Sequence, residues 1–115
     1  MPRKSRAGQA ERFAGMLSAM GTAPRLGILR LLLSAHPQGM IVGEIAAELG
    51  MANSTLSHHL DRLRNQHLVQ VSREGTCLRY SADTAALQQL LGFLYAECCT
   101  RNRAIEPAAI FACCN

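Results

Sequence analysis

The chain has 115 residues, of which 49% are hydrophobic and 17% are charged, and its formal net charge is +4. This length suits one domain of about 100–150 residues, and the composition is that of a folded protein. The length leaves no room for a deep two-lobed catalytic cleft, so we do not expect an enzyme. No apolar run approaches the ~20 residues of a membrane span, and the N-terminus lacks the apolar stretch of a signal peptide. We therefore expect a cytoplasmic protein with reduced cysteines and no membrane partner.

Arginine supplies eleven of the twelve cationic side chains. Guanidinium groups bind phosphate through two parallel hydrogen bonds and recognise guanine, so this bias favours a nucleic-acid partner. Residues 1–12 hold four cations and one acid. We interpret residues 1–12 as a mobile basic arm.

Two helices are expected next. Apolar residues recur at helical spacing between Phe13 and Met20, and Gly21 follows as a stop. Pro24 favours the first turn of a second helix. One face of this helix is predicted to hold Leu26, Leu29 and Leu33, with Ile28 and Leu32 widening it.

A third helix is expected from Val42 to Leu49, closed by Gly50, and a fourth begins after a short turn near Asn53. The core face of the fourth helix is predicted to hold Leu56, Leu60 and Leu63.

Two alternating segments, residues 68–73 and 76–81, flank Glu74-Gly75 and predict a β-hairpin. A last helix is expected from about residue 84 to about residue 100, and residues 101–115 form a cysteine-containing tail. We therefore predict a mainly α (α+β) fold, a winged helix-turn-helix with about five helices and a two-stranded wing. In this fold one helix enters the major groove, and the preceding helix braces it through a tight turn.

Residues 19–33 and 45–83 resemble the ArsR/SmtB family of bacterial metal-responsive repressors. The most specific parts are residues 54–60 and a wing of the form Arg-Glu-Gly-x-x-x-Arg-Tyr. The resemblance covers roughly residues 17–99. It implies a homodimer paired through the first and last helices, so that residues 13–100 form one domain for DNA binding and dimerisation. It also implies that the fourth helix enters the major groove of double-stranded operator DNA.

Polar side chains on the fourth helix and the wing are the candidate DNA contacts. Hydroxyl, amide and guanidinium groups bind base edges and phosphates. The predicted set is Asn53, Ser54, Thr55, Ser57, His58, Arg62, Arg73 and Arg79. His58 and His59 point ~100° apart on a helix, which disfavours a shared metal ion, and His59 is expected to pack against neighbouring helices.

Two vicinal cysteine pairs, Cys98-Cys99 and Cys113-Cys114, stand out among the five cysteines. Thiolates are soft ligands that select thiophilic species such as trivalent arsenic or antimony. Adjacent cysteines at a helix end can both turn toward one such centre. Cys77 on the hairpin is separated from the first pair by ~22 Å of helix, whereas the tail can fold back. Cys113 is therefore the favoured third ligand, with Cys114 as its substitute.

The resemblance also indicates which type of metal site to expect. One branch of the family carries arsenic-binding cysteines on the third helix, and another binds zinc through Asp and His on the last helix; this chain has neither set. It is similar instead to arsenic regulators in which a cysteine pair ends the last helix.

We therefore predict an arsenic-responsive repressor that is released from DNA by arsenite, methylarsenite or antimonite, with no organic cofactor. Thiol-redox or other soft-metal sensing is the alternative, although a lone vicinal pair is a poor tetrahedral zinc cage. A thiol oxidoreductase would need the Cys-x-x-Cys motif that this chain lacks. An interaction module without DNA binding is the remaining alternative.

Overall fold

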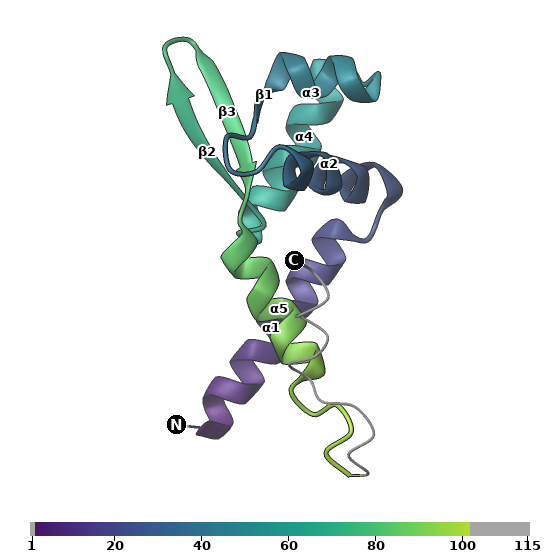
Figure 1. Ribbon diagram of the computed structural model, residues 1–115, viewed down its shortest axis with the longest axis vertical. Helices are drawn as coiled ribbons and strands as arrows, with labels where there is room; N and C mark the ends of the chain where they lie inside the picture. Colours follow the sequence, from purple (N-terminus) through teal and green to yellow (C-terminus); the bar gives the residue numbers. More distant parts are fainter. Residues whose placement is uncertain (1, 102–115) are drawn as a thin grey trace. The chain divides into compact units, whose positions relative to one another are not determined.

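The computed structural model describes the backbone of residues 2–101 and the side chains of residues 8–101. Its elements are α1 (Pro2–Met20), α2 (Ala23–Ser34), β1 (Met40–Ile41), α3 (Val42–Leu49), α4 (Asn53–Asn65), β2 (Val69–Glu74), β3 (Cys77–Ala82) and α5 (Thr84–Tyr95). The chain divides into two compact units, Met1–Thr84 and Ala85–Asn115. The predicted order of helices and hairpin is confirmed (Figure 1).

The first unit is built on a core of buried apolar side chains from four helices and the sheet. Leu56, Leu60 and Leu63 of α4 are completely buried, as predicted. The other helices contribute Phe13 and Met16 from α1, Ile28, Leu29 and Leu32 from α2, and Ile45 from α3. Helices α2, α3 and α4 lie on one side of the β2–β3 hairpin (Figure 1).

The structure corrects two of the five residues predicted for the apolar face of α2. Leu26 and Leu33 are 45% and 39% exposed, while Ile28 and Leu32 are buried beside Leu29. The apolar residues of α2 are so numerous that helical spacing alone does not single out the buried stripe. Leu17 of α1 is exposed as well, so this unit keeps apolar side chains on its surface.

Residues 2–12, predicted as a mobile arm, are helical and continue into the rest of α1. Arginine, alanine, glutamine and glutamate are good helix formers, and Pro2 suits a first helical position. The basic residues of the segment did not reveal this helix, because its apolar stripe begins only at Phe13.

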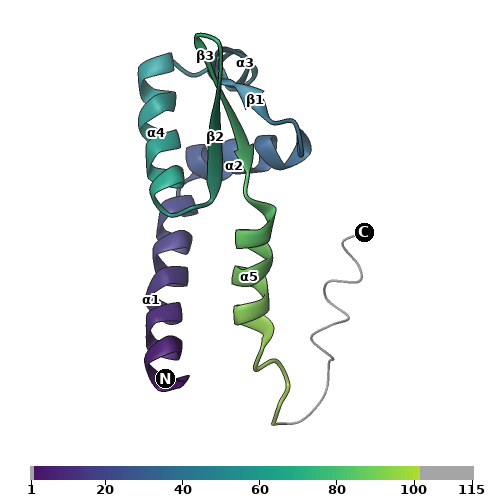
Figure 2. The same ribbon diagram turned by 90° about the vertical axis from the view of Figure 1, so that its left-hand side faces the viewer.

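The predicted two-stranded hairpin is confirmed as β2 and β3, and a third strand that was not predicted, β1, gives the order β1-β3-β2 with both pairs antiparallel. Strand β1 is only two residues long, and Met40 pairs with Tyr80. The hairpin turn is Gly75-Thr76 rather than Glu74-Gly75, since Glu74 pairs with Cys77. Figure 2 shows β1 beside β3, where it joins the wing to the start of α3.

Two glycines with positive φ set the chain path around α3. Gly50 (φ 63°) ends α3 in the left-handed conformation, and the chain turns directly into α4. Gly39 (φ 74°) lies against β3, where an added Cβ would be 2.1 Å from the Tyr80 carbonyl oxygen. Gly39 therefore needs both its conformational freedom and its missing side chain.

No single helix in the described part of the chain is long and apolar enough to cross a membrane; α1 and α2 meet that criterion only as a pair bent by 98°.

Gly39→Ala is expected to lower the free energy of unfolding by about 2–4 kcal/mol, because a left-handed backbone and a clash with β3 backbone act together. Gly50→Ala is the matched control, since its φ is similar but nothing lies within 4 Å of an added Cβ. It should cost about 1 kcal/mol. Urea unfolding at one fixed protein concentration measures both. Equal losses would contradict the close approach of Gly39 to β3.

Candidate functional site

Helix α4 presents a polar face on the surface of the first unit. All six of its predicted contact residues are exposed, while its three leucines are completely buried on the other side. The exposed residues are Asn53, Ser54, Thr55, Ser57, His58 and Arg62. The buried leucines fix the rotation of α4, so these hydrogen-bonding groups share one outward surface.

The two wing arginines differ in their surroundings. Arg73 on β2 is exposed. Arg79 on β3 is only 29% exposed in its side chain, and its Nε lies 2.9 Å from Oε2 of Glu74. Its Nη1 donates a 3.2 Å hydrogen bond to the Gly39 carbonyl. Arg79 therefore ties the wing to the segment before β1, a role that the sequence did not indicate.

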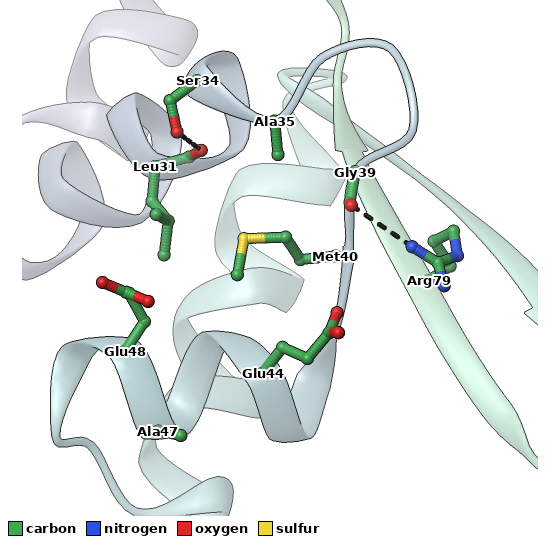
Figure 3. Close-up of a pocket in the computed structure, with 9 residues that line it drawn as sticks. All are labelled: Leu31, Ser34, Ala35, Gly39, Met40, Glu44, Ala47, Glu48 and Arg79. Atoms are coloured by element: carbon green, nitrogen blue, oxygen red, sulfur yellow. Dashed lines mark hydrogen bonds between the residues drawn. The ribbon is translucent and has the colours of Figure 1, made fainter.

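A pocket of about 880 Å³ lies beside this tie, between α2, α3 and β3 (Figure 3). Glu44 and Glu48 enter it from α3, and Arg79 enters from the wing. Oε1 of Glu44 accepts a 3.1 Å hydrogen bond from the Ile41 N–H and so caps α3. Glu44 and Arg79 thus both hold the chain around β1, which makes this pocket a structural junction.

His59 is partly buried, in line with the expectation that it packs against neighbouring helices. Its Nδ1 is buried without a hydrogen-bond partner. Burial lowers the pKa of His59, and the charges of Arg25, His58 and Arg62 lower it further. Arg25, at the start of α2, is a contributor that sequence reasoning missed, because nothing in its spacing links it to α4.

In the second unit, α5 ends at Tyr95, so the cysteine pair lies beyond the helix rather than inside its last turn. The N–H of Cys98 bonds to the Tyr95 carbonyl at 2.9 Å, and the N–H of Thr100 bonds to the Glu97 carbonyl at 3.3 Å. These three-residue steps replace α-helical bonding. Cysteine and threonine are weaker helix formers than the leucines that precede them.

Cys98 and Cys99 bring their sulfur atoms together at 3.4 Å, within hydrogen-bond distance. Cys99 has a φ of 57°, which is uncommon for a residue with a side chain. The hydrogen bond to Cys99 raises the pKa of the Cys98 thiol, and burial and the charge of Cys99 act in the same direction. Both cysteines are free and partly exposed, so the pair is accessible to a thiophilic reagent.

No group of three His, Cys, Asp or Glu side chains that could hold a metal ion occurs between residues 8 and 101. Cys77 is free and exposed at the start of β3. Cys113 and Cys114 lie outside the described residues, so their part as third ligand and substitute stays a prediction.

Replacing His59 with glutamine is expected to flatten the pH dependence of stability. The folded-state pKa of His59 lies below its ordinary value of 6.5, so the unfolded chain binds the proton more readily. The free energy of unfolding should therefore fall as the pH drops below that value, and it should fall less in His59→Gln. Urea unfolding at about pH 7.5 and about pH 5.5 measures this loss.

His36→Gln, at an exposed site, is the control and should keep the wild-type dependence on pH. If His59→Gln loses as much stability on acidification as the wild type, His59 is not the titrating group.

Comparison with known proteins places these features in a family. The sequence model described as "Bacterial regulatory protein, arsR family" matches residues 24–71. The nodulation protein NolR of Rhizobium meliloti is 41% identical over 85 residues, which cover 74% of this chain and 67% of NolR.

Two solved structures resemble the fold. Reduced HlyU from Vibrio cholerae superimposes with a TM-score of 0.62 at 30% identity, covering 80% of this chain and 97% of HlyU. The homodimeric winged helix-turn-helix DNA-binding domain of Mb0332 from Mycobacterium bovis, a possible ArsR-family regulator, gives a TM-score of 0.62 at 30% identity. That match covers 88% of this chain and 94% of the domain.

Proposed function

The chain belongs to the ArsR family of bacterial regulatory proteins, and we propose that it is a cytoplasmic repressor that trivalent arsenic releases from operator DNA. The polar face of α4 carries the DNA-binding part of this proposal. The 3.4 Å approach of the Cys98 and Cys99 sulfur atoms carries the sensing part.

In the DNA-bound state, α4 lies in the major groove. A groove ~12 Å wide admits one helix, and the short turn at Gly50 sets α3 behind α4 as the bracing helix. Asn53 and the hydroxyls of the first turn contact base edges and phosphates. Arg73 neutralises a phosphate from the wing, whereas Arg79 acts mainly by holding the wing in place.

The repressor acts as a homodimer paired through α1 and α5. Leu17 of α1 is 43% exposed, and Leu91 and Leu94 of α5 are 41% and 51% exposed. A second copy of the chain would remove these leucines from water, at about 25 cal/mol for each Å² of apolar surface buried. The Mb0332 domain with the same fold is homodimeric. Two-fold pairing presents two copies of α4 to half-sites one helical turn apart.

Arg73→Gln is expected to weaken operator binding and to reduce the slope of log K against log salt by about 1, because one phosphate contact is lost. The thermal midpoint should not change, since Arg73 is exposed and its charge is not needed for folding. Fluorescence anisotropy on duplex DNA from the upstream region of its own gene, at several salt concentrations, measures the slope.

Arg30→Gln removes the same charge at an exposed position on α2, outside the proposed interface, and should leave the slope unchanged. Equal slopes for the two variants would remove Arg73 from the interface.

The effector is trivalent arsenic or antimony, held by Cys98 and Cys99. Their sulfur atoms are close enough for both to bind one soft centre with bonds of ~2.3 Å, and no bond joins them. Cys113 is proposed as the third ligand, with Cys114 as its substitute. The pKa of Cys98 is raised, so Cys98 is a thiol at neutral pH, and its proton leaves as water with one hydroxide of arsenous acid when the As–S bond forms.

Release follows from linkage between the two sites. Arsenic binding after α5 would change the dimer pairing that spaces the two α4 helices, and half-sites accept only one spacing. A coupling of about 1–3 kcal/mol is typical of such linkage. Operator DNA must then weaken arsenic binding by the same factor.

The double variant Cys98→Ser/Cys99→Ser is expected to bind operator DNA with wild-type affinity but to stay bound when arsenite is added, because both sulfur ligands are lost. Anisotropy of the protein–DNA complex during an arsenite titration at fixed salt measures release. Cys77→Ser, which removes a free exposed thiol on β3, is the control and should be released like the wild type. Release of the double variant at wild-type arsenite concentrations would refute the site.

Thiol-redox sensing is the second candidate, because the two hydrogen-bonded thiols could also be oxidised. A strained ring between adjacent cysteines makes their disulfide the less favourable outcome. The oxidant diamide separates the two functions in the same assay. Release by diamide but not by arsenite would favour redox sensing, and release by zinc or cadmium alone would favour another soft metal.

A further inference from the structure

A small pocket of about 190 Å³ lies where α1, α2 and α4 meet in the first unit. Its volume equals that of roughly six water molecules at ~30 Å³ each. The pocket is lined by Gly15, Ser18, Ala19, Arg25, Arg62, Asn65 and Gln66.

The lining side chains are rich in hydrogen-bond donors. Arg25 uses its Nε to donate to the Ala19 carbonyl, which fixes the guanidinium and leaves its two terminal nitrogens available. Arg62 lines the pocket from α4, and the other polar lining residues are Ser18, Asn65 and Gln66, which carry a hydroxyl and two amides. Two guanidinium groups beside such donors match the requirements of a tetrahedral oxyanion.

No carboxylate is among the residues that line the pocket. Asp61 precedes Arg62 in sequence, but it acts on Tyr80 of β3: burial raises the pKa of Tyr80, and Asp61 raises it further. The charges of Arg25 and Arg62 in turn help to lower the pKa of His59, after the larger effect of burial. The charges of Arg25 and Arg62 therefore act on the nearby His59, and no lining carboxylate neutralises them.

We infer that this pocket binds a phosphate-type oxyanion between the guanidinium groups of Arg25 and Arg62. Arg62 then serves an anion site at the base of the DNA-reading helix rather than reading a base. The anion has two possible sources, a free phosphate-type ion in solution or a phosphate of the DNA backbone. Both offer the same oxygen atoms to the same donors.

Inorganic phosphate titrated into the ¹⁵N-labelled full chain, without DNA and at constant ionic strength, tests the site directly. Saturable shifts are expected at the side-chain N–H groups of Arg25, Arg62, Asn65 and Gln66. Arg25→Gln and Arg62→Gln should each weaken phosphate binding by about tenfold or more, the loss expected for one charge-assisted hydrogen bond. Arg30→Gln and Arg64→Gln, exposed positions on the same two helices, should bind like the wild type.

Gly15→Ala tests the pocket without removing a charge. An added Cβ would lie 2.5 Å from Oε1 of Gln66, so the amide must move and the space shrinks. Phosphate binding should fall while the thermal midpoint is kept or raised, because alanine favours the helix. This separates loss of the site from loss of the fold if Arg25→Gln proves unstable.

The same variants on DNA identify the source of the oxyanion. If free phosphate does not bind, but Arg25→Gln lowers the salt slope of DNA binding by about 1 and Arg30→Gln does not, the pocket takes a backbone phosphate. If free phosphate does not bind and Arg25→Gln leaves the salt slope of DNA binding unchanged, the inference is overturned. The phosphate titration contains no DNA and no arsenic, so its outcome is independent of the proposed repressor function.

Discussion

The completely buried leucines of α4 are the constraint on which the rest of the first unit depends. Leu56, Leu60 and Leu63 fix both the position and the rotation of the helix. Their burial decides which side chains of α4 face outward, and one of these, Arg62, also lines the pocket that Arg25 lines from α2. Removing one of them would leave a cavity at a cost of about 2–5 kcal/mol and would loosen the polar face as well.

Charge is distributed among the arginines by their contacts rather than by their number. Arg79 is occupied by Glu74 and the Gly39 carbonyl, Arg25 is anchored to the end of α1, and Arg73 is exposed. The number of arginines therefore does not give the number of guanidinium groups that are available to a polyanion. Arg79 holds the wing in place, whereas Arg73 is exposed to solvent and can bind an anion.

Helix order, the α3–α4 turn and the buried face of α4 could be predicted from the sequence, because apolar spacing and Gly50 are local signals. Strand β1 could not, since two residues carry no period and the pairing of Met40 with Tyr80 is a contact across forty positions. The ties of Arg79 and the meeting of Arg25 with Arg62 were missed for the same reason. The cysteine pair was found, but the end of α5 at Tyr95 was not, because no glycine or proline marks it.

The contacts that hold β1 in place bear on how the DNA preference of such a protein can change in evolution. The strand is held by the Glu44 cap on one side and by the bond from Arg79 to Gly39 on the other. The loop that precedes β1 is therefore bonded to the wing, although it contains none of the proposed DNA contacts. Changes of length in that loop could re-aim the wing over neighbouring base steps while leaving the reading helix untouched. Operator preference could thus change through a loop that holds none of the proposed DNA contacts.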